Sequence, residues 1–260
     1  MKLVMLGSGT STGVPRVGGE DGRGDWGNCD PEEPRNRRTR VSIVVESEAG
    51  ARLLIDTSSD CRAQLLANRI GSVDAVFWTH DHADHCHGID DLRVMRYGRG
   101  GPIPGYASSE TVRRLRQRFG YVFAGQDGYP TICSIDTLER LRIVAGFGVE
   151  WCQMAHGPGE TTGFRFEADG KSIAYATDFS EISEEMVETF GSVDILVSDC
   201  LRRDPHPTHA HLAMAIELAE RANAGRLVLS HLDKSMDYRS LCDEVPEHVT
   251  VGYDGLEMKA

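Results

Sequence analysis

Short apolar runs that each end at a histidine or an aspartate recur along the chain. Six of these runs have the length of a β-strand and are rich in aliphatic and β-branched residues. They are ARLLID, VDAVFWTH, VEWCQMAH, SIAYATD, VDILVSD and RLVLSH, which end at Asp56, His80, His156, Asp178, Asp199 and His231. Strands that all end in potential ligands predict one sheet edge, or an edge shared by two sheets, with a site built along it.

Segments with helical periodicity alternate with these strands. They cover residues 59–71, 108–120, 183–191 and 208–225, and the second of them is basic on one face. Serine or aspartate caps are expected at Ser59 or Asp60, at Ser108 or Ser109, and at Ser183. The last helix is expected to begin at Thr208 and to stop at Gly225. Alternating strands and helices predict an α/β fold.

Residues 7–42 interrupt this alternation. The segment is rich in glycine, proline and charge, and predicts a long loop, which in a compact domain is usually functional or disordered. Its glycines do not form a GxGxxG fingerprint between a strand and a helix, which argues against a nucleotide-binding fold. For the basic run PRNRRTR (34–40), two interpretations stay open: a patch that attracts an anion, and a solvated turn.

Length and composition narrow the class of protein. The 260 residues, 40% of them hydrophobic, are enough for a single domain over residues 1–260. No apolar run approaches the ~20 residues of a membrane span. The apolar stretch at the start of the chain is too short for the hydrophobic region of a secretory signal. We therefore expect a cytoplasmic protein without membrane contact. The formal charge of −12 argues against a nucleic-acid partner. It leaves open a small anionic substrate, because a bound metal supplies local positive charge.

The segment HDHADH (80–85) concentrates potential metal ligands in one turn. Two histidines two positions apart in an extended turn can face one metal, and the following aspartate and histidine can face a second. Imidazoles with carboxylates suit Zn²⁺, Mn²⁺ or Fe. Two complete sites need further ligands, which the strand ends at His156, Asp178 and His231 can supply.

This ordered set resembles the metallo-β-lactamase superfamily, whose αββα sandwich carries HxHxDH followed by a distant His, Asp and His. The resemblance implies an α/β fold of two mixed β-sheets flanked by helices, with two divalent metal ions, Zn²⁺ or Mn²⁺. By motif position, one metal takes His80, His82 and His156, the other takes Asp84, His85 and His231, and Asp178 bridges both. It also implies that Asp56 supports the histidine turn through hydrogen bonds. Asp199 is interpreted as a supporting carboxylate.

Three segments resemble the phosphoribosyl 1,2-cyclic phosphodiesterase group of this superfamily. They are the opening LGSGTSTGVPR…CDPEEPRNRRTRVS, the segment PHPTHAHLAMAIELA with His209 in the place of an extra histidine, and the closing strand VTVGYDGLEM. Relatives often carry several cysteines in the N-terminal loop that hold a structural zinc. Here the loop holds Cys29 alone, and the seven cysteines contain no CxxC pair, so we predict no structural zinc.

The resemblance implies hydrolysis of a small phosphodiester, of cyclic or nucleotide-like type, by a hydroxide held between two metals. In this hypothesis Asp84 accepts the proton of the water. His209, in the first turn of the helix that begins at Thr208, donates a proton to the leaving group. We expect His206 to be a loop residue and His211 to lie a turn into the helix.

Other functions remain open at this point. A tRNA 3′-processing endonuclease shares the metal set, but the chain shows no segment comparable to a tRNA-binding arm. A glyoxalase II-type thioester hydrolase would normally add a C-terminal helical domain, which the sequence after His231 does not predict. A non-catalytic metal-binding module is the alternative from a different class. A homodimer is compatible with the sequence.

Overall fold

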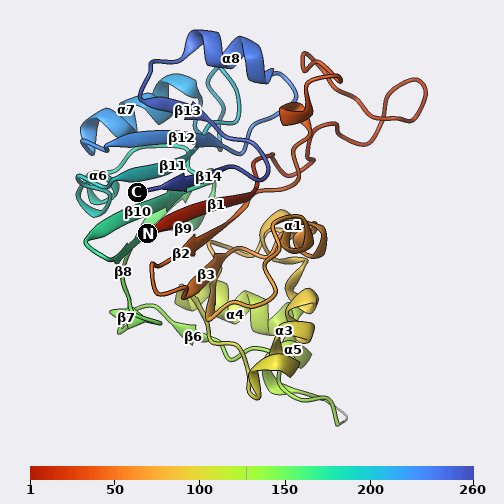
Figure 1. The fold of residues 1–260 in the computed structure, drawn as a ribbon, viewed down its shortest axis with the longest axis vertical. Coiled ribbons are helices and arrows are strands. Elements are labelled where there is room, and N and C mark those ends of the chain that lie inside the picture. Colours follow the sequence, from red (N-terminus) through yellow and green to blue (C-terminus); the bar gives the residue numbers. More distant parts are fainter. Residues whose placement is uncertain (127) are drawn as a thin grey trace.

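The computed structural model describes residues 1–126 and 128–260, and in this part of the chain two seven-stranded β-sheets pack face to face (Figure 1). Helices cover the outer face of each sheet. Both sheets contain parallel and antiparallel pairs. The αββα sandwich with two mixed sheets is therefore confirmed.

The first sheet has the strand order β14-β1-β2-β3-β4-β5-β6. Its strands are β1 (Lys2–Gly7), β2 (Ser42–Glu46), β3 (Arg52–Ile55), β4 (Ala75–Phe77), β5 (Gly105–Ala107), β6 (Asp136–Thr137) and β14 (Glu257–Lys259). The second sheet has the order β13-β12-β11-β10-β9-β8-β7. Its strands are β7 (Ile143–Val144), β8 (Phe147–His156), β9 (Gly159–Ala168), β10 (Lys171–Ala176), β11 (Ile195–Asp199), β12 (Arg226–Ser230) and β13 (Val249–Val251).

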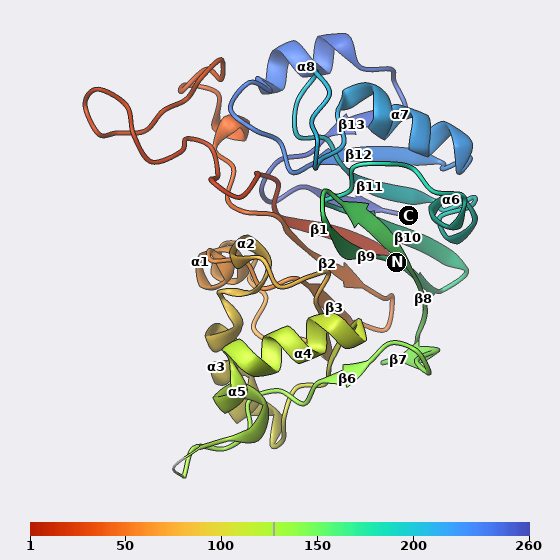
Figure 2. The same cartoon turned by 180° about the vertical axis from the view of Figure 1, so that it is seen from behind.

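The helices of the first half pack beside the first sheet, and those of the second half beside the second sheet (Figure 2). The α-helices are α1 (Cys61–Ala67), α2 (Ala83–Cys86), α3 (Leu92–Arg99), α4 (Ser109–Arg118), α5 (Gly120–Ala124), α6 (Glu184–Thr189), α7 (Leu212–Arg221) and α8 (Tyr238–Glu244). Two short 3₁₀ turns, η1 (Pro34–Asn36) and η2 (Ile89–Asp91), complete the described helical segments. Among the described residues, no helix combines the length and the apolar character needed to cross a membrane.

The central strands are apolar on both faces because each sheet is buried on both sides. In β3, Leu53 and Ile55 point into the core between the sheets, and Leu54 points toward the helices outside. The core between the sheets also contains the aromatic rings of Phe77 and Phe164, whose centroids lie 5.4 Å apart. This burial explains why the strands appear in the sequence as continuous apolar runs.

The predicted helices agree with the structure where a local cap defines them. Ser108 accepts a hydrogen bond from the Thr111 amide at the start of α4, and Ser183 caps α6 in the same way. The predicted helix 59–71 is shorter, because α1 ends before Arg69, which adopts a left-handed backbone (φ 55°).

The predicted start of the last helix at Thr208 is wrong, because α7 begins at Leu212 with His211 as its N-cap. The carbonyl oxygen of Thr208 lies 2.7 Å from Nδ1 of His156 and accepts a hydrogen bond from it. The Leu212 amide donates to the carbonyl of Arg202 instead of to a preceding helical turn. Long-range hydrogen bonds thus hold residues 208–211 in an extended conformation.

The predicted closing strand is also wrong, because VTVGYDGLEM divides into two strands in different sheets. β13 pairs with β12 in the second sheet, and β14 pairs with β1 in the first. Between them, the half-buried Asp254 carboxylate accepts hydrogen bonds from the amides of Ser8 (2.9 Å) and Thr39 (2.7 Å). These bonds hold the chain where it crosses from one sheet to the other.

The N-terminal loop between β1 and β2 projects from the sandwich, as predicted for residues 7–42 (Figure 2). The buried Arg38 joins the base of the loop to the second half of the chain, since its Nη1 donates to the Asp233 carbonyl (3.3 Å). The Arg35 guanidinium lies 5.0 Å from the Tyr238 ring centroid, and that of Arg37 lies 4.8 Å from the Trp26 ring centroid. These side chains of the basic run therefore anchor the loop.

Truncation of Phe164 to alanine tests the core between the sheets. Phe164→Ala leaves a cavity among fully buried aromatic rings, so we expect the free energy of unfolding to fall by about 3–5 kcal/mol. Urea denaturation measures the change. Tyr97→Ala, at an aromatic side chain that is 58% exposed, is the control and should change stability by less than about 0.5 kcal/mol. Equal effects of the two variants would contradict this description of the core.

Candidate metal centre

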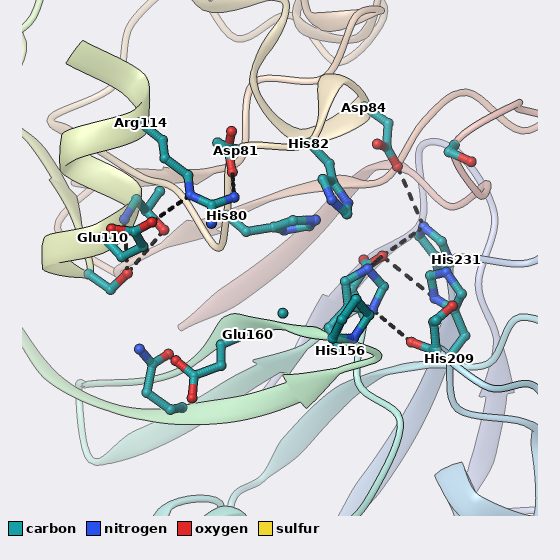
Figure 3. A pocket seen from close by; sticks show the side chains of 18 residues that line it. His80, Asp81, His82, Asp84, Glu110, Arg114, His156, Glu160, His209 and His231 are labelled. Carbon is teal, nitrogen blue, oxygen red and sulfur yellow. Dashed lines mark hydrogen bonds and ion pairs between the residues drawn. The ribbon is translucent and has the colours of Figure 1, made fainter. Parts of the chain in front are cut away.

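The potential ligands meet at one end of the sandwich, where strands of both sheets end (Figure 3). His80 follows β4 of the first sheet. In the second sheet, His156 ends β8, Asp178 follows β10, and His231 follows β12. Of the two alternatives that the sequence leaves open, one sheet edge or an edge shared by two sheets, the structure has the second.

The backbone at these strand ends is strained. Asp56, Asp178 and His231 have φ values of 64°, 59° and 58°, in the left-handed region that non-glycine residues rarely adopt. Such conformations persist only where the surrounding structure enforces them, and they cluster at functional sites. At these three positions the left-handed backbone coincides with strand ends whose side chains meet in one cluster.

His80, His82 and His156 form a first group of potential ligands, with one donor atom from each within 4.8 Å of the others. The ring centroids of His80 and His82 lie 4.3 Å apart, and those of His82 and His156 lie 5.3 Å apart. His82, the N-cap of the short helix α2, is exposed, whereas the other two are buried. Three imidazoles that converge in this way suit a metal such as Zn²⁺.

Asp84, His85 and His231 form a second group with the same mutual spacing of donor atoms. The helix α2 carries Asp84 and His85 together. An oxygen of Asp84 lies 3.2 Å from Nε2 of His85 and 3.6 Å from Nε2 of His231. All three side chains are buried.

Asp178 lies between the two groups. Its carboxylate oxygens lie 3.2 Å from Nε2 of His85, 3.6 Å from Nε2 of His231 and 3.8 Å from Nε2 of His156. It therefore faces histidines of both groups, the position that a bridging ligand requires. The bridging role itself stays a prediction.

The chemistry of the imidazoles fits bound cations. Within the described residues, the buried Nε2 atoms of His80, His85 and His231 make no hydrogen bond. Protein groups hold the other ring nitrogen of two of them: Nδ1 of His80 lies 3.0 Å from Thr79 Oγ1, and Nδ1 of His85 lies 2.7 Å from Asp56 Oδ2. Imidazoles oriented through one nitrogen, with the other facing a cluster of carboxylates, are typical of metal ligands.

Buried charges perturb the pKa values throughout the cluster. Burial holds the pKa of His80 well below its usual range. Burial also disfavours the charged form of His85, but Asp84 and Asp178 outweigh it and raise the pKa of that imidazole. Burial would raise the pKa of Asp178, yet His231 and His85 hold it well below its usual range. The buried carboxylates thus require positive charge around them, which divalent cations also supply.

Asp56 supports the histidine turn as the resemblance implied. Its fully buried carboxylate accepts hydrogen bonds from the Thr79 amide (2.9 Å) and from Nδ1 of His85 (2.7 Å). Asp199 has a comparable place beside His209, whose Nδ1 lies 3.0 Å from Asp199 Oδ2. These carboxylates orient imidazoles from behind the cluster.

His209 lies at the edge of the cluster, but not in the first turn of a helix as predicted. It belongs to the extended segment before α7, two positions before the N-cap of that helix. His211, predicted to lie inside the helix, is the N-cap. His209 is 15% exposed, and its Nδ1 lies 3.5 Å from an oxygen of Asp178.

A pocket of about 740 Å³ opens over the cluster and extends toward α4 (Figure 3). Its walls include Glu110 and Arg114 from α4, and Gln153 and Glu160 from the β8–β9 hairpin. These four residues are not among the site residues predicted from the sequence. The basic face of segment 108–120 was a local indication for Arg114, whereas the other three stand in no motif.

Comparison with known proteins agrees with this geometry. A model of the beta-lactamase superfamily domain matches residues 51–232, which contain both groups of potential ligands. The chain belongs to the metallo-β-lactamase superfamily. Its His/Asp groups are suited to binding metals, and the superfamily consists mostly of metal-dependent hydrolases.

Relatives with different activities resemble this chain. A solved structure described as a new diphosphatase from the PhnP family is 33% identical, covers 99% of this chain and 97% of its own, and has a TM-score of 0.85. An octanoyltransferase from Porphyromonas gingivalis is 34% identical over 99% of this chain, which spans 51% of that protein. Ribonuclease Z from Halalkalibacterium halodurans is 25% identical over 76% of this chain and 82% of its own length.

Replacement of the Asp56 carboxylate tests its support of the centre. Asp56→Asn should weaken Zn²⁺ binding about 10–100-fold, because His85 loses a charged hydrogen-bond partner. Competition with a chromophoric chelator measures the affinity. Asp194→Asn is the control. The half-buried Asp194 carboxylate accepts a hydrogen bond from the Ser172 amide (2.9 Å) at the start of β10, the end of that strand away from Asp178. Unchanged affinity in Asp56→Asn would contradict the supporting role.

Proposed function

We propose that this protein is a dinuclear metal-dependent hydrolase that cleaves a small phosphodiester of cyclic or nucleotide-like type. The observation that carries the proposal is the pair of three-residue ligand groups with Asp178 between them. The proposed cofactors are two divalent ions, Zn²⁺ or Mn²⁺. His80, His82 and His156 would hold one ion, Asp84, His85 and His231 the other, and Asp178 both.

When bound, two such ions lower the pKa of a coordinated water toward about 7 and neutralise charge on a phosphate. Asp84 lines the pocket with its carboxylate beside His231, where it can accept a proton from an attacking water. The buried carboxylates Asp84 and Asp178 disfavour a phosphate that carries two negative charges. This arrangement favours a diester, which carries one.

His209 is the proposed donor of a proton to the leaving oxygen. It lines the pocket, and Asp199 holds its Nδ1 at 3.0 Å, so that Nε2 is free to serve a substrate. An imidazole oriented by a carboxylate is the usual arrangement of a general acid or base.

The comparisons support phosphorus chemistry at this site. The diphosphatase of the PhnP family matches the chain over nearly its whole length. It favours a second candidate function, cleavage of a diphosphate link, which uses the same attack at phosphorus. Ribonuclease Z acts on RNA, but the formal charge of −12 argues against a nucleic-acid partner here, so we propose a small-molecule substrate and a cytoplasmic location. A homodimer is compatible with these proposals.

A substrate panel with metal analysis tests the proposed function. Protein loaded with Zn²⁺ or Mn²⁺ should hold about two ions per chain, and Asp178→Ala should lose at least one. Bis(p-nitrophenyl) phosphate should be hydrolysed faster than p-nitrophenyl phosphate, because the monoester brings a second negative charge toward Asp84 and Asp178. A dinucleoside diphosphate in the same panel decides the second candidate.

Three results would overturn this proposal. Faster turnover of nitrocefin or S-lactoylglutathione than of any phosphate ester would indicate lactamase or thioesterase chemistry. A metal-loaded protein that hydrolyses no ester would indicate a binding module. One ion per chain in the presence of excess metal would exclude a dinuclear centre.

Removal of the His209 imidazole tests the general acid. His209→Ala should retain its metals and lose about 10²–10⁴-fold in kcat/KM on an alkyl diester, because an alkoxide needs a proton to leave. The loss on a p-nitrophenyl diester should be modest, since nitrophenolate leaves without one. His206→Ala is the control, because its ring centroid lies only 5.2 Å from that of His209. Equal losses on both substrates, or loss of metal, would contradict the assignment.

A further inference from the structure

We propose that the helix α4 positions the metal ligands His80 and His82 by holding the residue between them, Asp81. The positioning residues are two arginines of α4, Arg114 and Arg118. We call the contacts of these two arginines with the histidine turn the α4 support. The inference rests on the proposed function and deepens it, because it concerns how one of the two proposed ions is held.

His82 has the least support of its own among the three imidazoles of its group. Nδ1 of His80 lies 3.0 Å from a threonine hydroxyl, and Nδ1 of His156 lies 2.7 Å from a backbone carbonyl oxygen. His82 is exposed, and in the described part of the chain it is the N-cap of α2 without a side-chain capping bond. Its position therefore depends on the backbone that carries it, and first of all on Asp81.

The arginines of α4 contact both the side chain and the backbone of Asp81. Nη1 of Arg118 lies 3.0 Å from Oδ2 of Asp81, and it also donates to the Asp81 carbonyl. Nη1 of Arg114 lies 3.3 Å from Oδ1 of the same carboxylate. The Asp81 carbonyl belongs to the planar peptide unit that ends at Cα of His82. A bond to this carbonyl therefore limits the movement of His82 itself.

Arg118 also contacts the far end of the turn. Its Nη2 lies 2.6 Å from Nε2 of His87, the residue that follows the last residue of α2. The His87 ring packs edge-on against Phe119, with the ring centroids 5.9 Å apart. One planar guanidinium thus joins Asp81 and His87, on either side of α2, which a single ammonium group could not do.

The helix that carries these arginines is itself fixed. Val112 and Leu115 bury the inner face of α4 in the core beside the first sheet. Arg114 and Arg118 lie four positions apart and therefore on one face of the helix. Figure 3 shows Arg114 extending from α4 toward Asp81. The histidine turn is thus supported by Asp56 on its buried side and by α4 on the other.

The expected effect of the α4 support is on ligand geometry more than on folding. The side chains of Arg114 and Arg118 are 49% and 35% exposed, and ion pairs with such exposure add little to stability. Ligands of a metal, in contrast, must be held within about 0.5 Å of their productive positions. Arg114 also contacts Glu110 and lines the pocket, so Arg118 is the residue that tests the support alone.

Replacement of Arg118 tests the inference through metal binding, without turnover. Arg118→Ala should weaken the binding of one Zn²⁺ ion about tenfold, the lower end of the range for residues behind a ligand. Arg118→Lys should recover part of this loss. Arg113→Ala is the control on the same helix, since Arg113 pairs with Glu110 at 2.7 Å. The control should leave both affinities unchanged, and the urea midpoints of metal-free Arg118→Ala and Arg113→Ala should be similar.

Variants that retain one ion identify the group that α4 supports. His231→Ala should retain the ion of His80, His82 and His156, whereas His82→Ala should retain the other ion. Arg118→Ala should weaken the retained ion about tenfold in the His231→Ala background and leave it unchanged in the His82→Ala background. The visible spectrum of bound Co²⁺, which reports ligand geometry, should change in the first background alone.

The outcomes separate this inference from the proposed function. Equal losses in both backgrounds, or a loss in His231→Ala no larger than that caused by Arg113→Ala, would overturn the inference. If Arg118→Ala does not fold, Asp81→Ala should give the same pattern, because it removes the carboxylate that both arginines contact. The predicted pattern in a protein that hydrolyses no phosphodiester would overturn the proposed function and preserve the inference. Phosphodiester hydrolysis with equal losses would do the reverse.

Discussion

Negative charge buried at the meeting edge of two sheets is the constraint on which the rest of this structure depends. Asp56, Asp84 and Asp178 lose hydration there, and a buried carboxylate is tolerated only with a compensating charge and hydrogen bonds. The neighbouring histidines supply part of the compensating charge and some of the hydrogen bonds. Asp56 is satisfied inside the protein by Thr79 and His85. Asp178 faces imidazole nitrogens that have no hydrogen-bond partner within the described residues, so the centre is suited to binding cations.

The sandwich makes such a centre possible because its rigid strands come from both halves of the chain. β4 presents His80 from the first sheet, and β12 presents His231 from the second. Neither half of the chain supplies both groups of potential ligands by itself. Left-handed backbone at Asp178 and His231 turns the chain at the strand ends, and the packed core beneath can bear this strain.

Members of one superfamily share such an edge and differ in what surrounds it. In this chain, α4 and the β8–β9 hairpin form the pocket walls. The N-terminal loop is a second individual feature. Arg38 connects the base of this loop to residue 233. The single cysteine of the loop is Cys29, and its Sγ lies 3.8 Å from Nη1 of Arg38. Contacts of arginine side chains thus anchor this loop.

The sequence by itself determined the six strands that lead to a histidine or an aspartate, the capped starts of α4 and α6, and the residues that meet at the candidate metal centre. These features depend on local patterns: continuous apolar runs, a serine at a helix start, ligands at strand ends. Only the tertiary structure decided that α7 begins at Leu212, because His156 takes the carbonyl of Thr208. It alone divided the closing segment between two sheets and joined Gln153 with Glu110 in one pocket. Such features depend on hydrogen bonds and contacts between distant segments, which leave no periodic trace in the sequence.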